Sequence, residues 1–186
     1  MAPLTAYPHL LKLPAWALAS ASHRFAAVDW TRPELAQGER VLATERDGPT
    51  RRRVVATQHA VYFQDLDHGF RSWHRLGWEQ VEHARWDAAR GTLRLVSLVP
   101  QLVPDLTLRL AAPGRLPDLA RERVTATTLA RVPLRHAGRV AGWLSARRPV
   151  AGDAEVTWVV RLAPGVALAD ADVDLAIRDA RAHTGL

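Results

Sequence analysis

From residue 38 to residue 111, short apolar runs alternate with turn-forming residues at a regular spacing. Within the runs, apolar and polar side chains alternate one by one, as in Leu106-Thr107-Leu108, which is the period of a strand with one buried face. Turn signals every 8 to 12 residues or so are typical of antiparallel sandwiches and barrels. The pattern predicts seven strands: 39–46, 52–57, 60–65, 70–76, 81–87, 92–98 and 105–111.

Beyond residue 112 the apolar spacing becomes helical. Pro117 and Asp118 suit the first turn of a helix, which we expect to end early because residues 124–128 are β-prone. After Pro133 a β-hairpin is expected from strands 140–147 and 155–162, followed by an amphipathic helix over 170–183. The expected fold class is therefore α+β and mainly β.

Residues 1–37 form an N-terminal extension in this interpretation, with one helical piece around residues 16–28. Either the extension packs on the main domain or it is a poorly ordered leader. Its apolar stretch, residues 10–21, is interrupted by Pro14 and has no basic residue before Lys12, which argues against a secretion signal. It is also too short to span a bilayer as a helix.

Composition narrows the function classes. The chain has no cysteine, which excludes disulfides, thiolate nucleophiles and cysteine-bound metals, and fits the reducing cytoplasm. The net charge of +6 points to anionic partners such as RNA, the ribosome or an anionic membrane surface. Lys12 is the single lysine, however, so part of the arginine content is explained by the codon usage of a GC-rich genome.

Three segments carry a resemblance to a known family. An opening strand begins with Gly38-Glu39, a strand pair runs from Val55 to Tyr62, and Trp78 lies at the entry to the next strand. This pattern resembles bacterial pleckstrin-homology-like (PH-like) domains, including actinobacterial proteins of this type.

The resemblance covers about residues 38–130 and implies a seven-stranded antiparallel barrel of two orthogonal sheets, closed at one end by a helix. The expected domains are the extension 1–37, a PH-like core 38–130, and a C-terminal β-hairpin plus helix, 131–186, packed on that core. Such domains are binding or assembly modules, so the resemblance implies interaction and not catalysis, although a fold does not by itself fix a function.

The densest basic cluster is a candidate anion-binding site, formed by Arg46, Arg51, Arg52 and Arg53. Its position in the first hairpin resembles that of the basic residues that contact lipid headgroups in PH domains. Strand alternation allows only every second arginine to face one surface. The simpler interpretation is a solvated sheet edge whose charges discourage strand pairing.

Trp73, Trp78 and Trp86 form the aromatic centre of the sequence. With the arginines around them they are a candidate contact surface for nucleic acid. The simpler interpretation is that they pack in the core or at its rim.

No catalytic or cofactor motif is visible. The histidines have no metal-ligand spacing, and the run Asp170 to Asp174 lacks the glycine and glutamate that a calcium loop needs at its sixth and twelfth positions. Glu79 and Glu82 justify no acid and base assignment. We therefore expect no cofactor, no metal and no enzymatic activity.

The expected function is a non-enzymatic interaction module that binds a protein partner or self-associates. The alternatives are binding of a polyanion, either RNA or an anionic membrane, through the arginine-rich surface, and an enzyme whose site forms only in the folded chain. The predicted location is the cytoplasm, at the membrane periphery if the polyanion is lipid, with no transmembrane segment.

Overall fold

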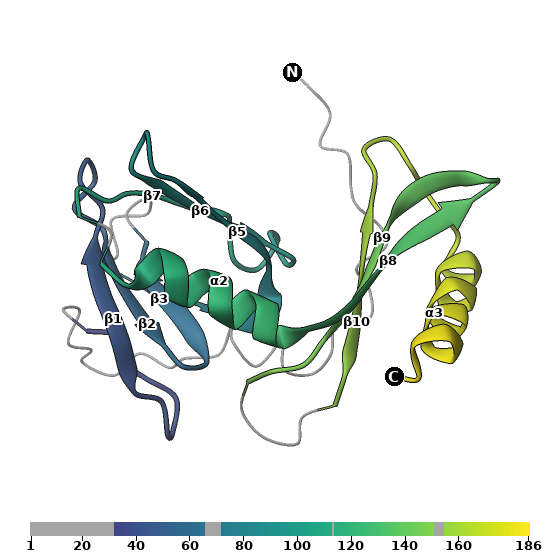
Figure 1. The fold of residues 1–186 in the computed structure, drawn as a ribbon, viewed down its shortest axis with the longest axis horizontal. Helices are drawn as coiled ribbons and strands as arrows, with labels where there is room; N and C mark the ends of the chain where they lie inside the picture. Colours follow the sequence, from purple (N-terminus) through teal and green to yellow (C-terminus); the bar gives the residue numbers. More distant parts are fainter. Residues whose placement is uncertain (1–31, 66–71, 113, 151–154) are drawn as a thin grey trace. The chain divides into compact units, whose positions relative to one another are not determined.

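The computed structural model describes residues 32–65, 72–112, 114–150 and 155–186. Over these residues the chain is mainly β, with three antiparallel sheets and two α-helices, which confirms the α+β, mainly β expectation (Figure 1). The elements are β1 Val41–Arg46, β2 Arg53–Thr57, β3 Ala60–Gln64, β4 Trp73–Gly77, the 3-10 helix η1 Trp78–Gln80, β5 Val81–Asp87, β6 Thr92–Ser97, β7 Leu106–Arg109, α2 Leu116–Thr127, β8 Thr128–His136, β9 Arg139–Arg147, β10 Thr157–Leu162 and α3 Asp170–Thr184.

Contacts divide the described chain into two compact units. The core unit comprises the described residues from 32 to 129 together with residues 147–150, 155 and 156, and the C-terminal unit comprises Ala130–Ala146 and Thr157–Leu186. The predicted domain boundaries are not otherwise tested and stay a prediction. The helical piece expected near residues 16–28 lies outside the described residues.

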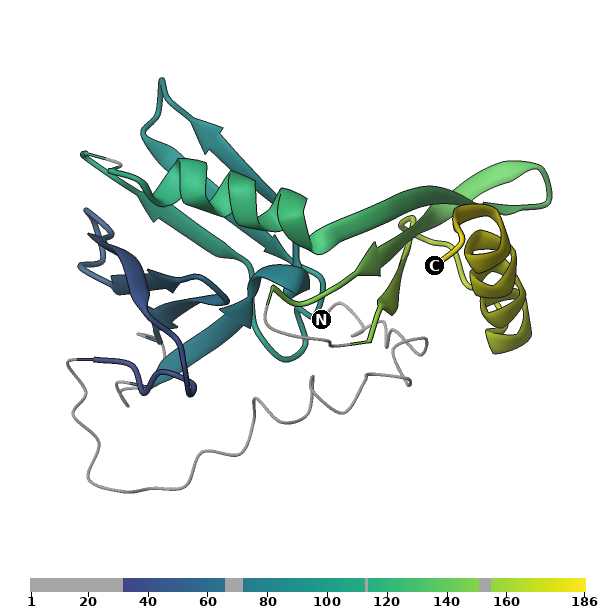
Figure 2. The same cartoon turned by 60° about the horizontal axis from the view of Figure 1, so that its bottom comes forward.

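The core unit contains the seven predicted strands in two sheets, of order β1-β2-β3-β4 and β5-β6-β7. Their alternating apolar residues meet in one hydrophobic cluster, to which α2 adds Leu116, Leu119 and Val124 (Figure 2). Trp78 and Phe63 are among its largest fully buried side chains. Apolar burial of this kind contributes roughly 25 cal/mol per Å² and is the main stabilising term in the unit.

Helix α2 starts one residue before the predicted position. The β-prone residues near its end had predicted an early stop, but the helix continues to Thr127. Val124 stays helical because it faces the hydrophobic cluster, where it is 8% exposed. The hydroxyls of Thr125 and Thr128 donate to carbonyls four residues back, at 2.8 and 2.7 Å. Such back-bonding makes threonine compatible with a helix and lets tertiary packing override β propensity.

Asp47, in the turn between β1 and β2, ties the two sheets of the core unit together. Its carboxylate accepts the backbone N–H of Arg109 in β7 at 2.7 Å and both the N–H (3.0 Å) and hydroxyl of Thr50. The N–H of Gly48 donates to the Arg109 carbonyl at 2.8 Å. Asp47 is only 4% exposed, so these donors replace water around a buried charge.

The C-terminal unit departs from the predicted hairpin, because its sheet has three strands in the order β10-β9-β8. The prediction missed β8, although Val132 and Leu134 face inward and Arg131 and Arg135 outward in strand alternation. Pro133 obscured that pattern, and β8 tolerates the proline because it is an edge strand.

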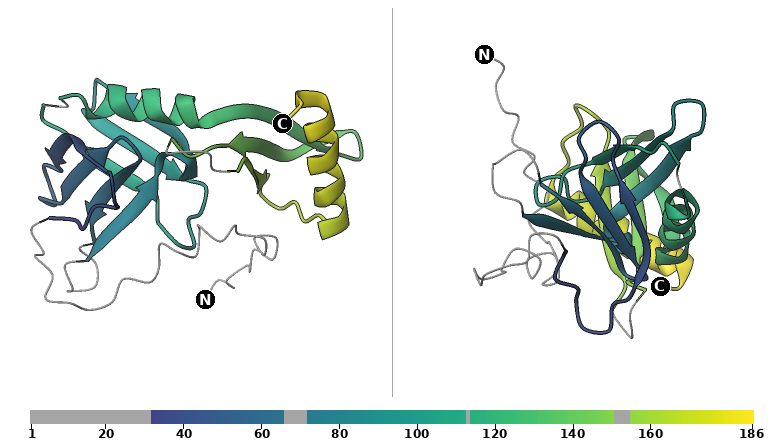
Figure 3. Two further views of the ribbon diagram at one scale, coloured as in Figure 1. Left: turned by 90° about the horizontal axis from the view of Figure 1, so that it is seen from below. Right: turned by 90° about the vertical axis from the view of Figure 1, so that its left-hand side faces the viewer.

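Two residues, Ala137 and Gly138, connect β8 to β9, and both have positive φ, at 47° and 75°. Such residues form the tight hairpin turn whose twist matches that of its strands. Helix α3 packs on one face of this sheet through Val173, Ala176 and Ile177 (Figure 3).

The hydrogen bonds of Asp47 predict a loss of stability in the Asp47→Asn variant that depends on pH. Burial by itself opposes ionisation, but the hydrogen bonds from Thr50 and Arg109 and the charge of Arg52 hold the pKa of Asp47 below its usual value. The carboxylate therefore contributes stability above its unfolded pKa of about 3.9, and this contribution is lost as the pH falls through the lower folded value. We expect Asp47→Asn to lower the free energy of unfolding by about 1–3 kcal/mol at neutral pH.

Urea unfolding at a series of pH values, followed by tryptophan fluorescence, measures this loss. The loss should shrink as the pH falls through the folded pKa. Asp118→Asn is the control, since the Asp118 side chain is 85% exposed. Equal effects of the two substitutions at neutral pH would contradict the assigned role of Asp47.

Candidate functional site

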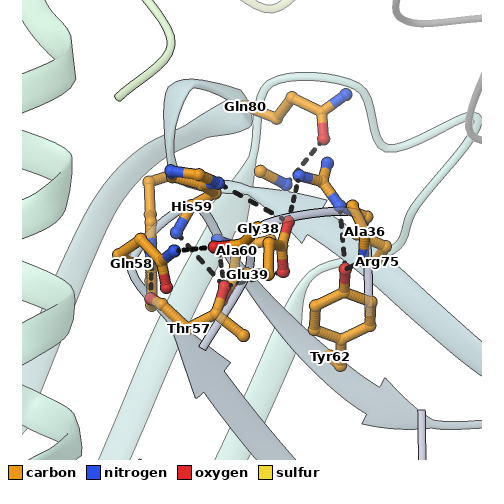
Figure 4. A network of polar contacts seen from close by, with 12 residues as sticks. Ala36, Gly38, Glu39, Thr57, Gln58, His59, Ala60, Tyr62, Arg75 and Gln80 are labelled. Carbon is orange, nitrogen blue, oxygen red and sulfur yellow. Dashed lines mark hydrogen bonds and ion pairs between the residues drawn. The ribbon is translucent and has the colours of Figure 1, made fainter. Parts of the chain in front are cut away.

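A group of buried polar side chains lies on the face of the four-stranded sheet that points away from the hydrophobic cluster. We call Glu39, Thr57, Tyr62 and Arg75 the Glu39 network (Figure 4). The Glu39 side chain is fully buried, and its carboxylate accepts hydrogen bonds from Arg75 Nη2 at 2.8 Å and from the Thr57 hydroxyl at 2.9 Å. Strands β2 and β4 thus supply the donors for a residue that precedes β1.

Tyr62 extends the network to the chain before Glu39. Its hydroxyl oxygen accepts Arg75 Nε–H at 3.2 Å and the N–H of Ala36 at 3.3 Å. Burial raises the pKa of Tyr62 above its usual value, so the phenol is neutral at physiological pH. Arg75 also lies over the Tyr62 ring, 5.9 Å from its centroid, which adds a cation–π contact.

The side chain of Gln58 binds the main chain of the same segment. Its side-chain amide nitrogen donates to the Gly38 carbonyl at 2.7 Å, and its side-chain oxygen accepts the backbone N–H of Arg40 at 2.8 Å. Gly38 has a φ of +78°, which favours glycine at this turn. Together with the Glu39 network, these contacts hold residues 36–40 against the sheet.

A second carboxyl group, that of Glu79 in η1, lies in the same region. Glu79 is 7% exposed, and its burial raises the pKa of the carboxyl group, with Arg75 and Arg147 acting in the opposite direction. The side chain folds over Gly77, where an added Cβ would lie 2.1 Å from Glu79 Oε1. A side chain at position 77 would therefore displace the Glu79 carboxylate.

Next to the Glu39 network, a surface groove of about 620 Å³ lies between residues 32–35 and the strands β1 and β2. We call it the arginine groove. Its apolar lining includes Leu35, which packs on Val55 and Tyr62. The lining residues are Arg32, Pro33, Leu35, Val41, Thr44, Glu45, Arg46, Arg53, Val54 and Val55.

Two of the predicted anion-binding residues meet in this groove. Arg46 and Arg53 are directly opposite each other in the β1–β2 register, and both line the groove with Arg32. Side chains directly opposite on such a pair have Cβ atoms about 4.5–5.5 Å apart, and like charges there repel. An anionic group in the groove is attracted by both guanidinium groups at once.

The other two predicted arginines lie elsewhere. Arg51 is exposed in the turn, with a φ of 60°, and Arg52 lies over the Phe63 ring, 5.9 Å from its centroid. The expected alternation does not separate these arginines, because β2 begins only at Arg53 and Arg51 and Arg52 precede the strand. Sequence reasoning missed Arg32, Glu39 and Arg75, because their neighbours come from distant parts of the chain.

The three predicted tryptophans do not form one surface. Trp78 is fully buried and donates its indole N–H to the Thr57 carbonyl at 3.0 Å, so it is a core residue and not a contact residue. Trp73 is half-buried beside Val55 and Tyr62, and Trp86 is half-buried against the main hydrophobic cluster. The sequence did not single out Trp143, which is 40% exposed.

Among the described residues, no three histidine or acidic side chains come together as a metal site. His74 Nε2 lies 3.3 Å from Asp65 Oδ2, and His59 Nδ1 lies 4.0 Å from Glu39 Oε1. Within the described ranges, no helix is both long enough and apolar enough to cross a membrane. The predicted cytoplasmic location stays a prediction.

The chain matches no protein-family model, no curated protein and no solved structure. The site is therefore interpreted from its own geometry.

The Glu39 network predicts local loosening in the Glu39→Gln variant. Glutamine keeps the size of the side chain but removes the charge that accepts from Arg75 and Thr57. We expect a loss of about 1.5–3 kcal/mol of unfolding free energy, typical of hydrogen bonds to a charged group. Hydrogen exchange of the amides of Ala36 and Arg40 should accelerate, whereas that of Leu95 in β6 should not. Glu34→Gln, at an exposed carboxylate, is the control.

Glu79 predicts a pH-dependent gain of stability in the Glu79→Gln variant. Its folded pKa is raised, so the folded state binds more protons than the unfolded state between the unfolded pKa of about 4.3 and the higher folded value. Stability attributable to Glu79 therefore falls as the pH rises through that window. Glu79→Gln should have a higher Tm than the natural chain at neutral pH, and this difference should disappear in acid. A Glu79→Gln variant with a lower Tm than the natural chain at neutral pH would contradict the assignment.

Proposed function

We propose that this chain is a non-enzymatic interaction domain with a PH-like core, which binds an extended acidic segment of a partner protein in the arginine groove. The order of four strands, three strands and a helix in the core unit supports the PH-like interpretation. The observation that carries the function is the groove itself, in which apolar side chains lie beside Arg32, Arg46 and Arg53.

The edge position of β1 supports an extended occupant. In the four-stranded sheet β1 is the terminal strand, and Val41, Thr44 and Arg46 from it line the groove. An edge strand offers backbone N–H and C=O groups, so an extended peptide adds to the sheet and places alternate side chains in the groove. Val41 is 49% exposed, and such a peptide would cover it.

The charges select the occupant. Guanidinium groups pair with carboxylates in two parallel hydrogen bonds, and both Arg46 and Arg53 line the groove. The same charges repel a second copy of a chain that carries a net charge of +6. They therefore favour an acidic partner over self-association through this edge.

Peptide-library selection on the intact chain tests this proposal. Enriched peptides should combine Asp or Glu with apolar residues, and Arg46→Glu should weaken their binding about 10-fold or more, as expected for loss of a charged pair. Arg51→Glu is the matched control, since it changes the same charge five residues away outside the groove lining.

The outcomes separate the alternatives. Peptides without acidic enrichment, or equal losses in the two variants, would overturn the proposal. A dimer in light scattering that Arg46→Glu dissociates would make a second copy of the chain the occupant.

A further inference from the structure

The three-stranded sheet of the C-terminal unit contains arginine and no acidic residue in its strands. Strands β8, β9 and β10 contain no Asp or Glu, while their exposed ionisable residues are Arg131, Arg135, His136, Arg139 and Arg161. The acidic residues that follow lie on α3, at Asp170, Asp172, Asp174 and Asp179. These three strands therefore contribute arginines, and no carboxylate of their own, to the sheet.

Packing of α3 determines which face of the sheet carries the charge. Val132, Leu134, Trp158, Val160 and Leu162 belong to the cluster that contains the apolar residues of α3. By strand alternation, the residues between them point to the opposite face. On that face lie Arg131, Pro133 and Arg135 from β8, and Val159 and Arg161 from β10.

The central strand adds an aromatic side chain to this face. Trp143 in β9 is 40% exposed and lies between Ala141 and Leu144, which are both buried in the α3 cluster, so strand alternation is interrupted at Trp143. The guanidinium group of Arg131 lies over the Trp143 ring, 4.6 Å from its centroid. An exposed indole and a guanidinium plane thus lie together, and both are groups on which nucleic-acid bases stack.

We propose that this sheet face binds single-stranded nucleic acid, with a base stacked at Trp143 and Arg131 and phosphates contacted by Arg135 and Arg161. Stacking requires an unpaired base, so a duplex cannot use the tryptophan. A membrane is less suited, because Arg131, Arg135 and Arg161 interrupt the apolar residues that would have to enter the lipid. This site is separate from the arginine groove in its residues and its ligand.

Fluorescence anisotropy with labelled oligouridine and oligothymidine of about 12 nucleotides tests the proposal on the full chain. Trp143→Ala should weaken binding about 5- to 100-fold, the range expected for loss of one base stack. Trp143→Phe should retain most of the affinity, because a smaller aromatic ring still stacks. Arg135→Glu should weaken binding and make its dependence on salt shallower by about one unit of the log–log slope.

Arg115→Glu is the control for net charge, since Arg115 is exposed next to α2 in the core unit. Thermal unfolding shows whether each variant is folded. If Trp143→Ala does not fold, the comparison of Trp143→Phe with the natural chain still tests the stacking role. Three results would overturn the proposal: no binding of either oligonucleotide, equal losses with Arg115→Glu and Trp143→Ala, or preference for duplex. Preference for vesicles of phosphatidylcholine and phosphatidylglycerol would replace nucleic acid with a lipid surface.

Discussion

The buried carboxylate of Glu39 determines how the chain enters the core unit. An ionised carboxylate removed from water is strongly destabilising unless donors surround it. Arg75 and Thr57, from β4 and β2, supply those donors. Because Tyr62 and Gln58 bind the main chain on both sides of Glu39, residues 36–40 have one favourable course across the sheet. That course places Leu35 and Arg32 beside β1 and β2, where they form one wall of the arginine groove.

Other buried charges join elements of the core unit that are far apart in sequence. Asp47 connects the β1–β2 turn to β7, and Arg147 is 2% exposed and donates to the Thr128 hydroxyl and the Glu82 carbonyl. Hydrophobic burial supplies most of the stability but is not directional. Hydrogen bonds to fixed charges are directional, so they define how the sheets, turns and strand ends meet.

Local patterns predicted most of the strands but little of the candidate site. Period-two alternation located β1 to β7, because each has one face in the hydrophobic cluster. Strand β8 was not predicted because a proline such as Pro133 usually argues against a strand, and because the pair Ala137-Gly138 signals a turn only weakly. The turn before β2, which removes Arg51 and Arg52 from the strand, was not predicted. The pairing of Glu39 with Arg75 depends on the order in which strands meet, which no local pattern contains.

The distribution of arginine also bears on why the chain is basic. Codon bias alone would scatter arginine without regard to structure, and in the core unit arginines do lie among carboxylates, as in the pairs Arg90–Asp87 and Arg94–Asp105. In β8, β9 and β10 the carboxylates are absent while arginines remain. Long-range attraction of an anion depends on the local sum of charges, so removing carboxylates strengthens the field as effectively as adding arginines. The net charge of the whole chain is therefore less informative than its concentration on one face.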